Sequence, residues 1–176
     1  VTDTHYQKQT SRNRAVIYGA NGELNLIIPT LHKKKPFQLE KEVEISNETS
    51  WQKEHWKSIC SAYRSSPFFE HYEKDFAVFF DINIVSLFDF NLELIKMIMS
   101  LLELPFSFQK VSFNKEIDIR LDDLIQTKKK SLIIQQPYTQ VFKYKSGFIS
   151  NLSIIDALFN LGPNCAFYVK NANSQI

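Results

Sequence analysis

Two arginines near the start of the chain are spaced so that they can act together on an anion. Arg12 and Arg14 lie two residues apart, where the sequence begins to alternate like a β-strand. Side chains two apart on a strand point to the same side, and two guanidinium groups on one face suit a phosphate or a carboxylate. The alternative is an edge strand whose charges prevent pairing with another chain. With Asn13 between them, these arginines are our first candidates for binding a substrate.

A histidine and a serine three residues apart in a predicted helix form a second candidate site. His55 and Ser58 lie on one face of that helix and can reach one site. Imidazole titrates near neutral pH, which suits acid–base catalysis, although a helical histidine can equally be a packed residue. Trp56 and Tyr63 share an apolar stripe and are predicted to be core. His55 is the candidate catalytic base, and Lys57 and Ser58 are candidate substrate-binding residues.

A single carboxylate stands among apolar residues near the end of the chain. Asp156 lies in the middle of a predicted helix, flanked by isoleucine, alanine, leucine and phenylalanine. A buried charge is costly unless it is paired or hydrogen-bonded, so we expect Asp156 to accept from Arg12 or Arg14. Such a pair either is structural or holds a substrate-binding arginine in place, and both alternatives stay open. Asp156 is the candidate orienting residue of a catalytic group, and Asn151 is a further substrate-binding candidate.

The signatures of the common enzyme families are missing from the sequence. It contains no P-loop, no dinucleotide-binding glycine motif, no nucleophile elbow, no zinc-protease motif and no kinase set. The four histidines are scattered, which does not suit a zinc site, and no metal or cofactor is predicted. The two cysteines form no CxxC pair and no secreted disulfide framework. Cys60 is predicted to be a small buried apolar residue.

The elements that must position these residues follow from local patterns. Asn21-Gly22 between two alternating segments predicts a β-hairpin of residues 14–19 and 23–29. Thr49 and Gln52 form a capping-box pattern for the first helix, and Ser66 with Pro67 predicts the start of a second that runs to about residue 80. Further helices are predicted from 83 or 86 to Pro105, at 118–126, from 151 or 153 to 160, and at 163–171. Further strands or extended segments are predicted at 42–46, 110–113 and 131–135.

This order of strands followed by helices predicts a mixed α+β fold, a small sheet with an N-terminal hairpin packed by several helices. A truncated α/β domain is the alternative. The length of 176 residues predicts one domain over 1–176, with a core rich in the 15 phenylalanines.

Composition excludes several classes of protein. A hydrophobic fraction of 44% excludes a disordered chain, and a net charge of +2 is too small to predict nucleic-acid binding. The two runs of three lysines, at 33–35 and 128–130, are predicted to be solvated loops, with a surface for a polyanion as the alternative. No signal peptide and no membrane-spanning apolar run are present, which predicts a soluble, cytoplasmic protein without membrane insertion.

Three ordered sets of residues make the chain resemble the WbqC-like family. The first is Arg12-Asn13-Arg14 with Asn21-Gly22-Glu23-Leu24 and Ile28-Pro29. The second is Trp51, His55-Trp56-Lys57-Ser58-Ile59, Ala62-Tyr63-Arg64, Pro67-Phe68-Phe69 and Tyr72. The third is Tyr138, Gln140-Val141-Phe142, Gly147-Phe148-Ile149, Asn151-Leu152-Ser153-Ile154-Ile155-Asp156, Leu158-Phe159-Asn160 and Gly162-Pro163. The resemblance spans nearly the whole chain.

The resemblance implies a role in making bacterial surface polysaccharide. Members of the family are associated with O-antigen gene clusters, and a transferase that adds a glycyl or other acyl group to a sugar has been suggested for them. The partner implied is then a nucleotide-sugar or acyl donor; a non-catalytic binding or assembly protein of the same pathway is the alternative. The family pattern also leads us to expect a strand, loop and helix ahead of Val1, so that this chain would be a fragment.

Overall fold

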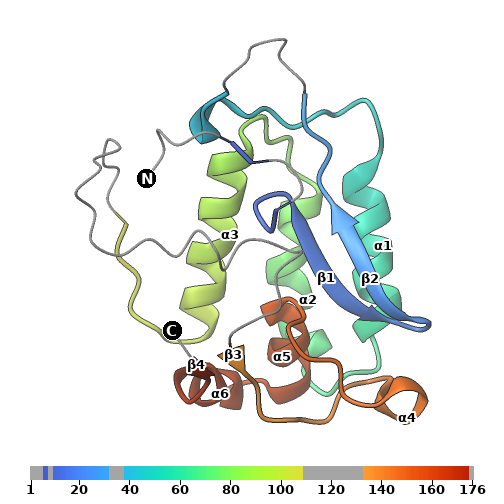
Figure 1. The fold of residues 1–176 in the computed structure, drawn as a ribbon. Helices are drawn as coiled ribbons and strands as arrows, with labels where there is room; N and C mark the ends of the chain where they lie inside the picture. The colour runs from blue at the N-terminus through green and yellow to red at the C-terminus, as the bar shows by residue number, and fades with distance from the viewer. Residues whose placement is uncertain (1–5, 8–9, 32–37, 109–132, 175–176) are drawn as a thin grey trace. The chain divides into compact units, whose positions relative to one another are not determined.

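A computed structural model of the chain describes residues 6–7, 10–31, 38–108 and 133–174 (Figure 1). The chain forms two compact units, each assembled from three separate stretches of sequence. Unit 1 contains residues 1–14, 28–49 and 83–130, and unit 2 contains residues 15–27, 50–82 and 131–176. Helices and antiparallel strands occur together, so the predicted α+β class is confirmed. The prediction of a single domain over 1–176 stays a prediction.

The N-terminal hairpin forms where the sequence predicts it. Strand β1 (Arg14–Gly19) pairs with strand β2 (Gly22–Ile27) in a two-stranded sheet. Gly22 has a φ of 103°, a conformation that glycine adopts readily and that the tight turn requires. Ile17 and Tyr18 of β1 are both fully buried, and because neighbouring strand residues point to opposite faces, both faces of β1 are covered there.

Helix α1 (Trp51–Tyr63) buries Tyr63 as predicted, but Trp56, also predicted to be core, is only half-buried, and the predicted capping box is wrong. The helix begins after Ser50, with no side-chain capping bond. Gln52 donates instead to the backbone carbonyls of Phe79 and Ile82. Cys60, predicted to be buried, is only half-buried.

Helix α2 (Phe69–Ala77) and the short η2 (Val78–Phe80) follow α1. The prediction that Ser66 and Pro67 open α2 is wrong, because Phe68 is the residue at its N-terminal boundary. The Ser66 hydroxyl donates back to the carbonyl of Tyr63 at 2.6 Å, so it closes the end of α1 rather than capping α2.

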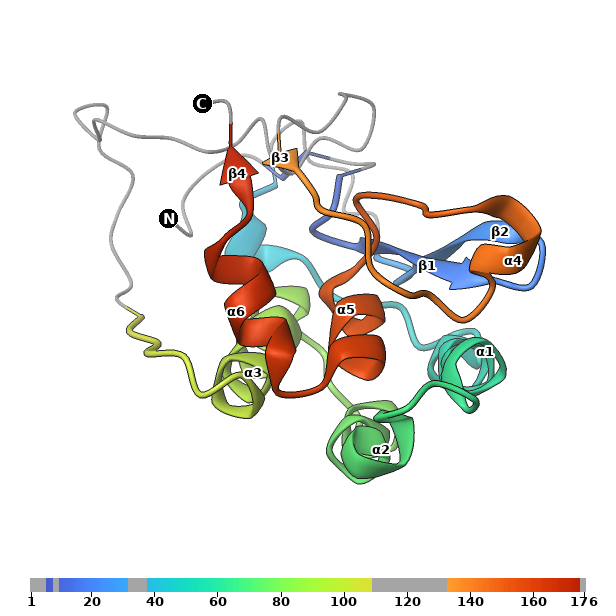
Figure 2. The same ribbon diagram turned by 90° about the horizontal axis from the view of Figure 1, so that it is seen from below.

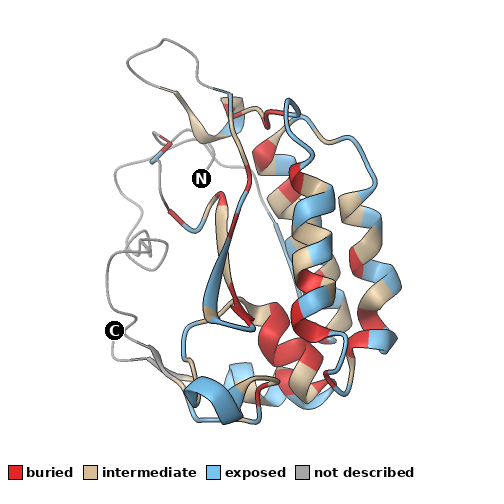
Figure 3. Cartoon of the chain, turned by 90° about the vertical axis from the view of Figure 1, so that its right-hand side faces the viewer, coloured by how far each residue is buried: buried red, intermediate tan, exposed pale blue. Residues whose placement is uncertain are grey.

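The C-terminal part of unit 2 contains α4 (Lys143–Ser146), α5 (Ile154–Leu161) and α6 (Asn164–Lys170). Helix α5 is the most buried of the three, as the colours of Figure 3 show. Strand β3 (Ile133–Ile134) lies within the segment 131–135 that is predicted to be extended. It pairs antiparallel with β4 (Asn173–Ser174). Figure 2 shows α4 beside the turn end of the β1–β2 hairpin.

Aromatic rings fill the core of unit 2. Phe159 on α5 lies within 5.2–5.3 Å of three other rings, measured between centroids, from α1 and α2: Tyr63, Phe69 and Phe76. The edge contacts of these rings suit their quadrupoles and hold the helices at fixed angles. The prediction of a phenylalanine-rich core is therefore confirmed for unit 2.

Unit 1 is organised around α3 (Leu87–Leu101) and the short η1 (Glu40–Glu42). Ser86 caps α3 by accepting from the backbone N–H of Asp89 at 3.2 Å, one of the two starts that the sequence predicts. The predicted strand at 42–46 is wrong in its extent. In the structure, this segment contains the end of η1, followed by two residues in isolated bridges: Glu44 pairs with Ser86 and Ile45 pairs with Thr30. Along α3, Ile98 is buried and Ile95 is exposed.

Several predicted features fall outside the described residues. These are both lysine runs, the strand at 110–113 and the helix at 118–126. None of the helices in the described part of the chain combines the length and the apolar character needed to cross a bilayer.

Candidate functional site

In unit 1, the two candidate arginines belong to a small polar cluster around a buried tyrosine. We call Tyr6, Arg12, Arg14, Thr30 and Glu40 the arginine cluster. Arg12 pairs with Glu40 at 2.5 Å, with both side chains largely buried. Burial raises the pKa of Tyr6, while the Thr30 side chain and the two arginines lower it and Glu40 raises it. Both arginines therefore act on Tyr6, but Arg12 lies in a turn ahead of β1, so the two do not share a strand face as predicted.

Arg14 differs from Arg12 in having no carboxylate partner among the described residues. Its Nε atom is buried and has no hydrogen-bond partner there. A buried donor of this kind normally has a hydrogen-bond partner in proteins, so it can donate to a ligand atom or to a water. Arg12 and Glu40 largely cancel each other in charge, which leaves Arg14 as the cation that can hold an anion.

Asn13, the third predicted residue of this segment, ties the base of the hairpin together. Its Nδ2 donates to the Ile28 carbonyl at 3.1 Å, and the Ile28 N–H donates to the Asn13 carbonyl at 2.9 Å. Its Oδ1 is buried without a partner among the described residues. Asn13 therefore has a structural task, with one oxygen left for a ligand or a water.

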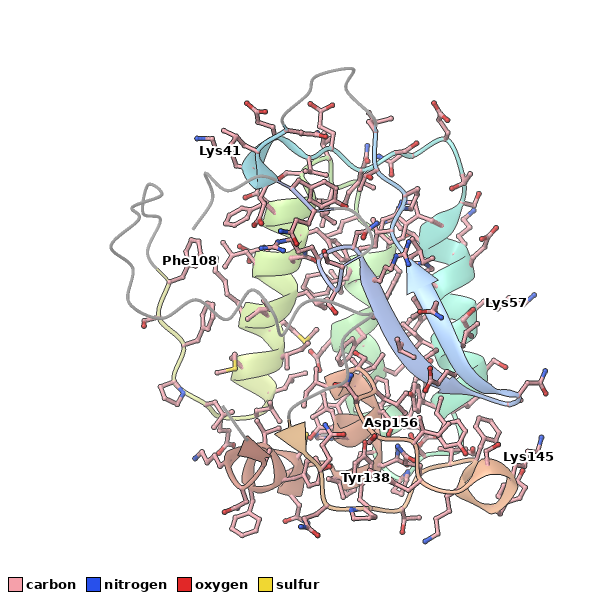
Figure 4. The ribbon with its side chains drawn as sticks, viewed as in Figure 1. Lys41, Lys57, Phe108, Tyr138, Lys145 and Asp156 are labelled. Atoms are coloured by element: carbon pink, nitrogen blue, oxygen red, sulfur yellow. The ribbon has the colours of Figure 1, made fainter. Side chains whose placement is uncertain are left out.

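In unit 2, the predicted carboxylate of Asp156 is fully buried and is held by neutral donors (Figure 4). Its Oδ2 accepts from the Tyr138 hydroxyl at 2.6 Å and from Gln140 Nε2 at 2.9 Å. Its Oδ1 has no hydrogen bond of good geometry in the described chain, although the Tyr63 hydroxyl lies near enough to favour the charged form. The predicted pairing of Asp156 with Arg12 or Arg14 stays a prediction, since both arginines belong to unit 1.

Burial decides the protonation of this group. It raises the pKa of Asp156, and the hydrogen bonds from Tyr138, Gln140 and Tyr63 oppose that shift without cancelling it. Burial, with the nearby Asp156 as a second cause, also raises the pKa of Tyr138 and Tyr63, so both phenols stay protonated as donors. A carboxylate so enclosed does not reach solvent, which suits an orienting or structural role rather than attack on a substrate.

His55 lies half-buried on α1 with its imidazole against the edge of the Trp51 ring, 5.2 Å between centroids. Burial lowers the pKa of His55, while a hydrogen bond to the backbone of Ile27 raises it. The imidazole is therefore neutral at physiological pH, with one nitrogen directed at a carbonyl. Such an arrangement fixes the tautomer and leaves the other nitrogen as a proton acceptor, which general-base catalysis requires.

The remaining predicted site residues are placed less favourably. The Ser58 hydroxyl donates to the Glu54 carbonyl of its own helix at 2.8 Å. Lys57 is exposed and points away from α1 in Figure 4. Asn151 is exposed with a φ of 60°, and its N–H donates to Gln135 Oε1 at 2.6 Å.

Sequence reasoning missed the residues that complete both sites, namely Tyr6 and Glu40 in unit 1 and Tyr63, Tyr138 and Gln140 in unit 2. Tyr138 and Gln140 are two apart in an extended stretch, so their side chains share a side. That spacing is the only local signal, and Glu40 carried none. Among the described residues, His, Cys, Asp and Glu side chains do not gather in threes or more to hold a metal ion. Cys165 is buried, and burial raises its pKa to about 11, so it is an inert thiol.

Comparison with known proteins gives one finding. The family model described as the WbqC-like protein family matches residues 1–133 of the 176, which includes both arginines and His55. The part of the resemblance at 138–163 lies beyond the matched residues. Neither the comparison with curated proteins nor that with solved structures gives a match. Because the matched residues make up well over half of the sequence, the chain belongs to the WbqC-like protein family.

Proposed function

We propose that this chain is a transferase of bacterial surface-polysaccharide biosynthesis that moves a glycyl or other acyl group from an activated donor to a sugar. Membership of the WbqC-like protein family is the observation that carries the proposal. The role in O-antigen synthesis is what the resemblance to that family implies. The geometry of two sites supports it. Arg14 offers a buried guanidinium without a carboxylate partner in the described chain, and His55 offers a neutral, oriented imidazole.

In the proposed reaction, a sugar hydroxyl attacks the carbonyl carbon of the acyl donor. His55 takes the hydroxyl proton as the new carbon–oxygen bond forms, and the bond from the carbonyl carbon to the donor's leaving group breaks. The imidazolium then gives its proton to the leaving group, so the reaction needs no other reagent. Arg14 is proposed separately, as a residue that binds an anionic group within unit 1.

A thermal-shift measurement with candidate donors tests the binding half of the proposal. The ligands are nucleotide-sugars, acyl donors and plain nucleotides, and a ligand of the native state raises the melting temperature by mass action. We expect one donor class to shift the wild type but not Arg14→Gln. Arg64→Gln is the matched control, because Arg64 is exposed and only loosely paired with Glu73, 3.7 Å away. The same shift in Arg14→Gln would remove the arginine cluster from donor binding.

A transfer assay with His55→Gln tests the catalytic half. Loss of a general base typically slows the chemical step by about 10²–10⁴-fold, and we expect that loss in kcat with KM little changed. His71→Gln is the control, because His71 is an exposed histidine on α2. Full turnover in the His55 variant would exclude this residue from the mechanism.

A non-catalytic binding or assembly protein of the same pathway is the second candidate. Two exposed aromatic side chains favour it: Tyr144 on α4 is 76% exposed and Phe167 on α6 is 72% exposed. Exposed aromatics are enriched where proteins bind partners. The absence of a thermal shift with every donor, together with no transfer by the wild type, would favour this candidate over the transferase.

A further inference from the structure

One buried glutamine joins the start and the end of residues 138–149 in unit 2. Gln140 Nε2 donates to the Ile149 carbonyl at 2.8 Å, and the Ile149 N–H donates to Gln140 Oε1 at 2.9 Å. The same Nε2 donates to Asp156 Oδ2 at 2.9 Å, and that oxygen also accepts from the Tyr138 hydroxyl at 2.6 Å. Both ends of the segment are therefore held to α5 through one carboxyl group.

The described groups that act electrostatically on this carboxyl carry no positive charge. They are the phenols of Tyr63 from α1, Tyr138 from the segment itself and Tyr168 from α6. Cys165 of α6 acts on Tyr168, and burial raises the pKa of its thiol to about 11, which leaves it uncharged. Within the described residues, β1 and α2 supply no group that shifts the pKa of Asp156. An ionised carboxyl would thus have no counter-charge there.

The second oxygen of the carboxyl makes ionisation in the closed structure more costly still. Asp156 is fully buried, and its Oδ1 has no hydrogen bond of good geometry in the described chain. Burial raises the pKa of the enclosed carboxyl, whereas a carboxyl in contact with water has its ordinary value. Because the enclosed state binds the proton more tightly, ionisation favours any state in which water reaches Asp156.

Of the parts of unit 2 around Asp156, residues 138–149 can move at the least cost. Helices α5 and α1 meet through Phe159 and Tyr63, which are both fully buried in the aromatic core. Residues 143–147 are all exposed, and Gln140 is the only buried residue between 138 and 149. Segments with few buried apolar contacts open more easily than the core. Release of this segment would let water reach the carboxyl without disturbing the packed rings.

We propose that Asp156 and Gln140 form a pH-sensitive latch, in which the protonated carboxyl holds residues 138–149 on α5 and the ionised carboxyl releases their base. The base consists of Tyr138, Gln140 and Ile149, and its release uncovers the side of α5 that carries Asp156. The latch lies within unit 2 and needs no donor or acceptor, so it does not depend on the proposed transfer reaction.

The tip of the segment has a separate attachment, which limits the release to the base. The Tyr18 hydroxyl of β1 lies 3.0 Å from the carbonyls of both Phe142 and Gly147. The Tyr18 ring also packs edge-on against Phe142, at 5.7 Å between centroids. Lys145 Nζ donates to the Ala20 carbonyl at 3.3 Å. These contacts do not involve the carboxyl, so the tip stays on the hairpin when the base opens.

Amide hydrogen exchange of the whole chain tests the latch at the Ile149 N–H, which Gln140 protects. The protection factor compares the measured rate with the intrinsic rate at the same pH, so it removes the general pH dependence of exchange. We expect protection at Ile149 to fall by up to about tenfold per pH unit above the ordinary value of 3.8 and to level off at the raised pKa of Asp156. The Gly162 N–H, which donates to the Leu158 carbonyl of α5 at 2.9 Å, should keep its protection.

Three variants separate the latch from a general loosening of unit 2. Asp156→Asn cannot ionise and should make the protection of Ile149 independent of pH. Asp75→Asn, at an exposed aspartate of α2, is the matched control and should keep the wild-type profile. Gln140→Met keeps the length of the side chain but not its amide. It should leave Ile149 unprotected at every pH while Gly162 stays protected.

Three results would overturn the proposal. The first is protection at Ile149 that does not change with pH in the wild type, or that changes equally in Asp156→Asn. The second is an equal fall at Gly162, because ionisation would then open α5 as a whole. The third is an Ile149 amide that remains protected in Gln140→Met, which decides the matter even where Asp156→Asn does not fold. None of these results bears on the transferase proposal, because the measurement contains no donor.

Discussion

At the scale of single residues, the carboxyl of Asp156 combines complete burial with donors that carry no charge. The phenol of Tyr138 and the amide of Gln140 stabilise the ionised form through hydrogen bonds, but neither supplies a counter-charge. Interior carboxylates without a cationic partner are costly to ionise. Asp156 therefore couples its hold on Tyr138 and Gln140 to its own protonation.

Replacing Asp156 by asparagine should change how stability depends on pH. Burial raises the pKa of Asp156 above its ordinary value of 3.8, so the native state holds the proton more tightly than the unfolded chain. The stabilisation from that proton is complete below the ordinary value and is lost as pH rises through the raised value. We expect the unfolding free energy of Asp156→Asn minus that of the wild type to increase from about pH 3 to about pH 7.

Urea unfolding of both proteins at a series of pH values gives this difference directly. Other titrating groups cancel in the subtraction, since they are common to the two proteins. A difference that is flat with pH, or that falls as pH rises, would mean that Asp156 is not costly to ionise in the native state.

For single residues, the sequence predicts that a buried polar group needs a hydrogen-bond partner, but it does not predict which residue that partner is. An aspartate among apolar residues must be hydrogen-bonded, and that much follows from residues 151–163 alone. Its donors lie 16 and 18 residues away, in a stretch whose own pattern is neither helical nor alternating. The same holds for Arg12, whose partner Glu40 is brought to it by tertiary structure. Contacts of that kind have no local signal.

At the scale of elements, the end of α5 shows what a glycine does beyond adopting a turn. Gly162 has a φ of 56°, and a Cβ added there would lie 2.5 Å from the Phe68 ring. Gly147, which follows α4, has a φ of 75° but nothing within 4 Å of an added Cβ. Both positions therefore have a positive φ that a side chain would strain, and only Gly162 lies close to Phe68.

Alanine at these two glycines should separate the two effects. Both Gly162→Ala and Gly147→Ala introduce a side chain at positive φ, but only the first forces the Phe68 ring to move. We expect Gly162→Ala to lose roughly 1–3 kcal/mol more stability than Gly147→Ala, the usual cost of overpacking. Urea denaturation of the two variants measures the difference. Equal losses would show that the core of unit 2 accommodates the extra methyl.

Elements were predictable where their signals are local. Asn21-Gly22 between alternating segments gives the hairpin, and Ser86 ahead of an apolar stripe gives the start of α3. The capping box at the start of α1 failed because Gln52 has better acceptors in the carbonyls that end η2. A tertiary hydrogen bond of this kind competes with a local cap and cannot be foreseen from spacing.

At the scale of the whole molecule, the two compact units are interleaved along the sequence. Each unit is built from three stretches, so the chain passes from one unit to the other five times. Each internal stretch is therefore tethered to the other unit at both of its ends. The hairpin is an example, because Arg14 of β1 belongs to unit 1, whereas the rest of β1 and all of β2 belong to unit 2. Length and composition predict one domain and carry no information on such interleaving.

Interleaving leads us to expect that the two units unfold together, and the two tryptophans make this testable. Trp51 and Trp56 both lie in unit 2, so their fluorescence reports that unit, whereas far-ultraviolet circular dichroism reports both. Phe90→Leu in unit 1 alters a buried side chain of α3 and should cost roughly 1–2 kcal/mol. We expect the urea midpoints from both probes to fall equally, because loss of unit 1 releases the ends of the unit 2 stretches. Ile95→Val, an exposed position on α3, should move neither. A fluorescence transition that stays at its wild-type midpoint while the dichroism shifts would show that unit 2 is stable without unit 1, and the chain would then consist of two independently stable parts in spite of its five crossings.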